Sequence, residues 1–122
     1  MIGTLLICAS LLAVDGDTIK CDGVNLRDMG DGAPNVSGYD TPEIYSPECD
    51  HERDLGREAT IRMEELLRTP GLQIIESGKR DRYERPLVSA MLASGQSIGS
   101  VLIAEGLAVE WTPGYKADWC SQ

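Results

Sequence analysis

Short blocks of apolar residues, separated by turn sequences, predict a small β-rich domain. Residues 5–14 are almost all apolar and lead into the turn sequence DGDT at residues 15–18, so we expect a strand that ends there. A second turn, Asp22-Gly23, separates two further short blocks. The same pattern predicts the remaining strands at residues 18–21, 24–27, 72–76, 87–92 and 107–111.

Two segments have the spacing of helices that pack one face on a core. Between residues 55 and 68, apolar side chains at i, i+4, i+7 and i+8 form one stripe, made by Ala59, Met63, Leu66 and Leu67. A Pro-Gly pair follows this segment and ends the helix. Ser97 is placed to cap a second, shorter helix that runs to Glu105, before a stop at Gly106.

The segment at residues 28–39 differs from both patterns. It is rich in Gly, Pro and Asp, residues that favour turns and interrupt strands and helices. We therefore expect an irregular loop between the strand that ends near Arg27 and the acidic turn that begins at Asp40.

Chain length limits the organisation to one core. The 122 residues, 42% of them hydrophobic, suffice for a single domain over residues 1–122, with residues 112–122 as a short tail. The apolar start, residues 1–14, lacks a basic n-region, and it is shorter than the roughly 20 residues that a membrane span needs. We expect it to form a buried strand, with no membrane partner, in a monomeric protein.

Two acidic turns carry the candidate chemistry. DGDT at residues 15–18 and DTPE at residues 40–43 supply carboxylates next to hydroxyls, and Arg27 lies between them in the sequence. Hard divalent cations such as calcium prefer oxygen ligands of this kind. Phosphodiester cleavage also needs a carboxylate to accept a proton from water and arginine to offset charge on phosphate oxygens, roles that suit Glu43 and Arg27. Either turn alone could be purely structural, but two flanking one arginine favour a site.

A second arginine lies in the sequence DRYER at residues 81–85. Arg85 is the candidate there, because its planar guanidinium suits bidentate phosphate contact better than an ammonium does. The alternative interpretation of Arg85 is a solvated charge beside Glu84.

From about residue 14 to residue 111 the chain resembles the thermonucleases, the staphylococcal-nuclease-like proteins. The resemblance rests on the order and spacing of VDGDTI, an arginine on the next strand, DTPE, GREA, DRYER and IGSVLIAEGLA. It implies an α+β, mainly β fold: a five-stranded OB-fold barrel with two helices.

The same resemblance implies a set of site residues. Calcium would be bound by Asp17 and Asp40, with the backbone carbonyl of Thr41 as a further ligand. Tyr83 and Tyr115 would border the nucleotide pocket.

The catalytic roles implied by the resemblance fall on Glu43, Arg27 and Arg85. Glu43 would act on the attacking water, while the two arginines would hold the phosphate and stabilise the transition state. The function expected is calcium-dependent hydrolysis of single-stranded DNA or RNA by attack of water on phosphorus. The alternative is a non-catalytic OB-fold module that binds nucleic acid or a protein partner. A structural calcium-binding domain is a third possibility.

Net charge sets a limit on nucleic-acid affinity. The chain has 20 acidic and 11 basic residues, a net charge of −9. Residues 1–50 carry nine acids and two bases, against eleven acids and nine bases in residues 51–122, so the acidity is concentrated around the proposed metal site. Few phosphate contacts imply weak nonspecific binding with a shallow salt dependence, which is typical of a slow or short-substrate nuclease.

The chain also departs from the family pattern at two positions and in one loop. Glu84 stands where relatives usually have glycine, and a positive φ there would cost about 1 kcal/mol. Asp28 stands where a hydrophobic residue is usual. The loop at residues 28–39 is longer than the same connection in the family.

Four cysteines, Cys8, Cys21, Cys49 and Cys120, allow three disulfide connectivities, and spacing does not resolve them. We prefer Cys49–Cys120, because the tail has little else to anchor it. Zinc binding by Cys49 and His51, or free thiols, are the alternatives. The even number favours an oxidising compartment, so we expect a secreted or periplasmic protein.

Overall fold

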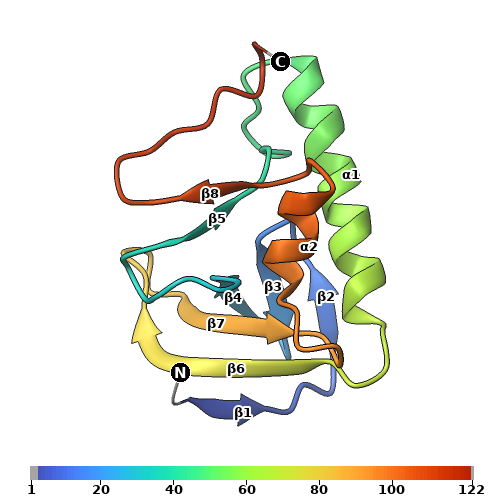
Figure 1. Ribbon diagram of the computed structural model, residues 1–122, viewed down its shortest axis with the longest axis vertical. Coiled ribbons are helices and arrows are strands. Elements are labelled where there is room, and N and C mark those ends of the chain that lie inside the picture. The colour runs from blue at the N-terminus through green and yellow to red at the C-terminus, as the bar shows by residue number, and fades with distance from the viewer. Residues whose placement is uncertain (1–2, 122) are drawn as a thin grey trace.

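The computed structural model describes residues 3–121 and folds as a curled β-sheet with two helices beside it (Figure 1). Its strands are β1 (Thr4–Leu6), β2 (Leu11–Ala13), β3 (Thr18–Cys21), β4 (Val24–Asp28), β5 (Gly38–Asp40), β6 (Gln73–Arg80), β7 (Pro86–Met91) and β8 (Val109–Trp111). The helices are α1 (Asp50–Leu67) and α2 (Ile98–Ala104).

The main sheet has the strand order β1-β6-β7-β4-β3-β2, so both of its edges come from the N-terminal segment. All of its pairings are antiparallel except the one between β4 and β7, where Arg27 lies opposite Leu87. Because β1 and β2 belong to one continuous segment, that segment curls the sheet and acts as the first of five barrel strands. The expected α+β, mainly β, OB-like fold with two helices is confirmed.

The first strand is broken rather than continuous. The break spans residues 7–10, where the backbone N–H groups of Ala9 and Ser10 donate to the Asp22 carboxylate at 3.3 and 2.7 Å. A disulfide between Cys8 and Cys21 ties the same bend to the end of β3. The bend lets one segment pair with β6 and then with β3, which no local pattern in the sequence could show.

The expectation of a buried N-terminal strand is wrong for the described part of that segment, and residues 1–2 lie outside the described residues. Leu5 is 49% exposed and Ile7 82% exposed, while Leu6 and Leu11 pack against the core. The side chains alternate because the segment forms sheet edges with one face on the barrel interior and one outside.

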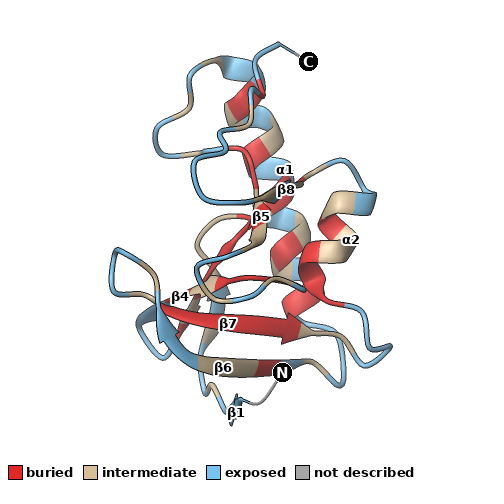
Figure 2. Cartoon of the chain, turned by 60° about the vertical axis from the view of Figure 1, so that its left-hand side comes forward, coloured by how far each residue is buried: buried red, intermediate tan, exposed pale blue. Residues whose placement is uncertain are grey.

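Helix α1 buries the predicted stripe where it packs beside β2 and α2, and Figure 2 shows its buried residues in red. Ala59, Met63, Leu66 and Leu67 are all buried, as predicted. The helix begins at Asp50, earlier than expected, because Cys49 serves as its N-cap. In α2 the predicted cap is confirmed: the Ser97 hydroxyl accepts the N–H of Ser100 at 3.0 Å.

The last part of the predicted loop forms a strand instead. Gly38–Asp40 is β5, which pairs with β8 in a separate two-stranded sheet, with Gly38 opposite Trp111. The partner strand lies far along the chain, so a three-residue strand gave no local signal. This pairing joins the C-terminal segment to the acidic turn at residues 40–43.

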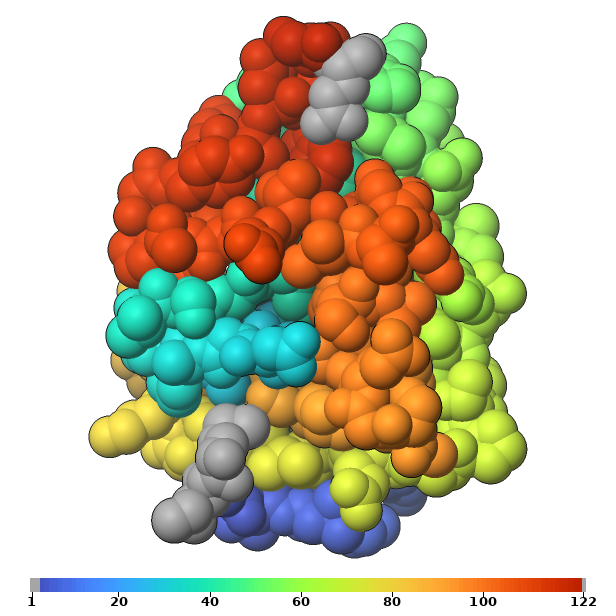
Figure 3. Space-filling model, in the orientation of Figure 1, coloured from blue at the N-terminus to red at the C-terminus, as the bar shows by residue number. Residues whose placement is uncertain are grey.

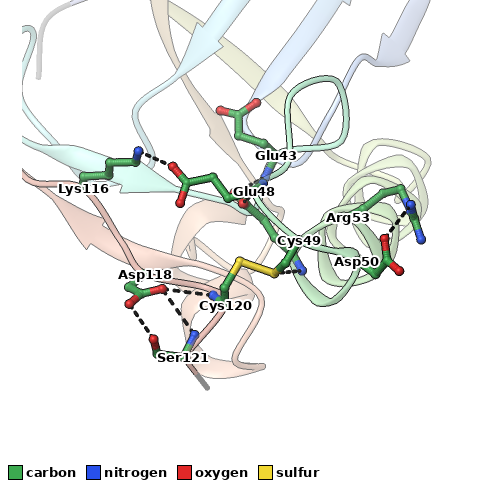
Figure 4. Close-up of a disulfide and its surroundings, with 10 residues drawn as sticks. Glu43, Glu48, Cys49, Asp50, Arg53, Lys116, Asp118, Cys120 and Ser121 are labelled. Carbon is green, nitrogen blue, oxygen red and sulfur yellow. Dashed lines mark hydrogen bonds and ion pairs between the residues drawn. A yellow bond between two sulfur atoms is a disulfide. The ribbon is translucent and has the colours of Figure 1, made fainter.

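The cysteines form two disulfides, Cys8–Cys21 and Cys49–Cys120, and no described cysteine is free. The preferred bridge is confirmed, and zinc binding by Cys49 and His51 is wrong because the Cys49 thiol is oxidised. Figure 4 shows this bridge between the loop before α1 and the tail, with Lys116 ion-paired to Glu48 nearby. Within residues 3–121, no helix has the length and apolar character needed to cross a bilayer.

Candidate active site

The two acidic turns meet directly. In the first turn, Asp15 Oδ1 accepts the N–H groups of Asp17 and Thr18 at 3.0 and 2.8 Å and so fixes the turn. A Cβ at Gly16 would lie 2.6 Å from the Thr41 side chain, so the two turns approach this closely only because residue 16 is glycine. Across the contact, the Thr41 N–H donates to Asp17 Oδ2 at 3.3 Å.

Arg27 projects from β4 onto the first turn. It lies opposite Thr18 in the β3–β4 pairing, and its Nη1 forms an ion pair with Asp17 Oδ2 at 2.7 Å. Its Nη2 donates to the Tyr39 carbonyl at 2.6 Å, next to the second turn. Although burial acts to raise the pKa of Asp17, the Arg27 guanidinium and the Thr41 N–H hold it below its usual value. Asp17 is therefore an ionised carboxylate.

Asp28, the next residue on β4, points the other way. It is 0% exposed and accepts hydrogen bonds from the Tyr39 hydroxyl at 2.7 Å and from the Ala90 N–H at 3.0 Å. Burial raises its pKa despite these bonds. Asp28 thus belongs to a buried hydrogen-bond network. Because successive side chains of a strand point to opposite faces, it does not lie on the face of β4 that carries Arg27.

Arg85 reaches the same turn from the β6–β7 turn, next to β7, the strand that pairs with β4. Within the β6–β7 turn, Asp81 accepts the backbone N–H of Arg85 at 2.9 Å and its Nε at 2.7 Å. Nη1 of Arg85 then donates to the Thr18 hydroxyl at 2.9 Å. The turn formed by DRYER therefore places the Arg85 side chain in contact with the DGDT turn.

Glu84 has the backbone conformation that its position suggested. Its φ is +65°, and its N–H donates to the Asp81 carbonyl at 3.0 Å. A residue with a Cβ is strained in this conformation. Its carbonyl accepts a hydrogen bond from Arg80 at 2.8 Å, and its side chain is exposed, so the strain is local to the turn.

Four carboxylates of the two turns share one electrostatic environment. Burial, and then the charge of Asp17, raises the pKa of both Asp15 and Asp40 to about 7. The pKa of Glu43 is raised by burial first and then by Asp17 and Glu52. Like charges this close favour any cation that neutralises them.

A cleft of about 540 Å³ adjoins the two arginines. Arg27, Arg85, Tyr83 and Tyr115 all line it, so both tyrosines that the sequence singled out lie on its wall. Neither Asp17, Asp40 nor Glu43 lines it, and the arginines are what connect the acidic turns to the cleft.

Two parts of the cleft wall were missed by sequence reasoning. Trp111 lines the cleft from β8, and the loop at residues 35–38 lines it beside β6, where Asn35 donates to the Arg80 carbonyl at 3.0 Å. Figure 3 shows this loop, in cyan, on the surface between the C-terminal segment and β6. No signal in the sequence marked these residues, because strand β5 brings them there.

The donor atoms around Asp17 fit a hard divalent cation. Asp17, Asp40 and the Thr41 carbonyl supply only oxygen. Burial, and after it the charge of Asp17, raises the pKa of Asp40, and a bound cation would relieve the repulsion between the two carboxylates. Among residues 3–121 there is no group of three or more His, Cys, Asp or Glu side chains arranged to hold a metal ion. A cation here would therefore rest on two carboxylates and backbone oxygen.

With the fold and the site described, the chain can be compared with known protein families. The model of a family described as staphylococcal nuclease homologue matches residues 35–119. The match spans well over half of the chain, and the chain belongs to this family. It includes Asp40, Glu43 and Arg85 but begins after Asp17 and Arg27. No curated protein matches the chain.

Proposed function

We propose that the protein is a calcium-dependent nuclease that hydrolyses phosphodiester bonds in single-stranded DNA or RNA. The observation that carries the proposal is the convergence of Arg27 and Arg85 on the Asp17–Thr18 turn, at 2.7 and 2.9 Å. Two guanidinium groups that face one ionised carboxylate from different strands have little reason to be there for stability alone.

Each of these groups has a defined task. Asp17, Asp40 and the Thr41 carbonyl would hold calcium, which when bound offsets negative charge on the phosphate. Arg27 and Arg85 donate hydrogen bonds to the phosphate oxygens and stabilise the charge that grows on them. Within the described chain, the hydrogen bonds of Arg85 to other residues use Nε and Nη1, which leaves Nη2 for substrate.

Glu43 accepts the proton of the attacking water. Glu43 is an exposed residue, but its carboxylate is partly shielded from water, and this desolvation, followed by the charge of Asp17, raises its pKa. A carboxylate of raised pKa is a stronger base once ionised, which suits this role.

The aromatic wall of the cleft favours a single-stranded substrate. Tyr83 is 65% exposed and stacks on the guanidinium of Arg82, 4.8 Å from the ring centroid. Tyr115 borders the same cleft. Bases can lie on such rings only when they are unstacked from a duplex. The net charge of −9 limits long-range attraction, so short substrates and modest affinity are expected.

The two disulfides support an oxidising location, secreted or periplasmic.

The test is cleavage of a labelled single-stranded oligonucleotide by the purified protein, with calcium and with a chelator. We expect cleavage that needs calcium and that falls by about a hundredfold or more in Glu43→Gln. Glu58→Gln removes a charge from the exposed side of α1 and is the matched control, expected to cleave like the wild type. No cleavage by wild-type protein in calcium would reject the proposal.

A second candidate is a non-catalytic OB-fold module that binds nucleic acid or a protein partner. It is favoured by the net charge of −9 and by the strained Glu84 beside Arg85. Binding of the oligonucleotide without turnover, unchanged by Glu43→Gln, would select this function over hydrolysis.

A further inference from the structure

A buried carboxylate on α1 holds the loop that carries Glu43. Glu52 is 6% exposed and lies in the first turn of the helix. Its Oε2 accepts the backbone N–H of Glu43 at 3.1 Å, and its Oε1 accepts that of Glu48 at 2.8 Å. One side chain thus fastens both ends of the loop at residues 43–48.

The helix is shaped to receive this loop. Gly56 lies one turn after Glu52 on the same face, and a Cβ there would come within 2.7 Å of the Pro42 carbonyl and 2.6 Å of the Ile44 side chain. The Pro42 carbonyl and the Ile44 side chain, on either side of Glu43, therefore rest directly on α1. Only glycine at this helical position permits the contact.

The backbone of Glu52 is itself held by the N-cap of the helix. Its backbone N–H donates to Sγ of Cys49, the N-cap of α1, at 3.4 Å. Cys49 is bonded to Cys120, so the first turn of the helix is tied to the tail. In an ordinary capping box, a glutamate at this position would bond the N-cap N–H. In this protein the Glu52 carboxylate instead accepts the N–H groups of Glu43 and Glu48 in the loop.

We propose that Glu52 is a positioning residue for Glu43, an inference that rests on the proposed nuclease function. By accepting the Glu43 N–H it fixes the backbone from which the Glu43 carboxylate projects. Both oxygens of the Glu52 carboxylate are engaged by the loop, so we assign this residue no contact with substrate or metal. A small displacement of a reacting group can cost about a hundredfold in rate, which is why such an anchor matters for activity.

The test compares Glu52→Gln with the wild type by two measurements. The first is kcat and KM on the single-stranded oligonucleotide in calcium, well below the unfolding midpoint of each variant. The second is amide hydrogen exchange of the calcium-free protein, read by NMR at Glu43, Glu48 and Ala90. Glutamine keeps the size of the side chain, but one of its two ends is an N–H donor that cannot accept a backbone N–H.

We expect Glu52→Gln to lower kcat by about ten- to a hundredfold with KM within about twofold. The amides of Glu43 and Glu48 exchange at least about tenfold faster, while that of Ala90, in the core strand β7, is unchanged. Glu52→Asp, which keeps the charge on a shorter stem, restores part of kcat. Glu58→Gln, which removes the same charge from exposed α1 surface, changes neither measurement.

Two results would overturn the proposal. The first is an unchanged kcat in Glu52→Gln despite faster amide exchange at Glu43. The second is an equally large increase in the exchange rate of the Ala90 amide, which would mark a general loss of stability. Inactivity of the wild-type protein counts against the nuclease function instead. The exchange at Glu43 and Glu48 then still decides whether Glu52 holds the loop.

Discussion

Arg85 donates a hydrogen bond to the hydroxyl of Thr18 at 2.9 Å, a contact between the β6–β7 turn and the first acidic turn. Arg27 forms its ion pair with Asp17, the residue directly before Thr18. The two guanidinium groups therefore meet at one dipeptide, Arg27 from strand β4 and Arg85 from the turn directly before β7, the strand that pairs with β4. This meeting point is where the acidic turns and the aromatic cleft join.

Replacement of Arg85 tests whether guanidinium geometry, and not charge alone, is needed. Arg85→Lys keeps the charge but cannot contact Asp81, Thr18 and a phosphate oxygen together. We expect kcat/KM on the oligonucleotide to fall by about a hundredfold or more. Arg57→Lys is the control, because Arg57 is exposed on α1 and does not line the cleft; it should stay within about threefold of wild type. Equal losses of kcat/KM in both variants would show that guanidinium geometry at residue 85 is not what the reaction needs.

Stability of calcium-free protein should depend on pH through Asp40. Its pKa in the folded state is about 7, raised by burial and by Asp17 above the usual 3.8. The folded state therefore holds this proton more tightly than the unfolded state, and that stabilisation is lost as the pH rises from about 4 through about 7. Asp40→Asn cannot lose a proton, so its free energy of unfolding should rise relative to wild type over this range.

Urea unfolding at several pH values, in chelator, measures this difference. Asp31→Asn, at an exposed loop position, is the matched control and should track the wild type. A constant gap between Asp40→Asn and wild type from pH 4 to pH 8 would show that Asp40 titrates normally.

The strained turn at Glu84 predicts a stabilising substitution. Because φ is +65° there, Glu84→Gly should relieve steric strain and raise the free energy of unfolding by about 0.5–1 kcal/mol, after the entropy cost of glycine. Glu84→Ala removes the same charge but keeps the Cβ, so it should give no such gain. Thermal and urea unfolding of the two variants separate backbone strain from charge; equal gains would assign the effect to charge.

The two disulfides should differ in their contribution to stability. The Cys49–Cys120 bridge closes a loop of 71 residues and Cys8–Cys21 one of 13. The chain-entropy model gives about 4 and about 3 kcal/mol respectively. We expect Cys49→Ser with Cys120→Ser to be the more destabilising pair in urea unfolding, although serine at residue 49 can still cap α1. The reverse order would show that native-state packing, and not loop length, dominates.

Features encoded in a few neighbouring residues were predictable. The stripe from Ala59 to Leu67 and the Ser97 cap depend on spacing within one or two turns, and both appear in the structure as predicted. The family resemblance, which implies glycine at the position of Glu84, drew attention to the backbone there, and its φ is +65°. Acidic turns and arginines also supplied the candidate residues, because residue type limits the chemistry available.

Features that depend on distant partners were not predictable. The break between β1 and β2 is set by Asp22 and by the need to pair with both β3 and β6. Strand β5 exists because β8 lies beside it. Glu52 lies before the helix predicted at residues 55–68 and had no assigned role; only its hydrogen bonds to the loop of Glu43 distinguish it.

The sequence by itself determined the kinds of groups available: oxygen donors in two turns, two arginines, and cysteines in a number that permits disulfides. The tertiary structure alone decided that Gly16 lets the two turns touch, that Arg27 and Arg85 reach adjacent residues, and that Asp28 faces the core. The reason is physical: residue type fixes charge and hydrogen-bonding capacity locally, whereas the distance and burial that tune them come from chain segments far apart in sequence.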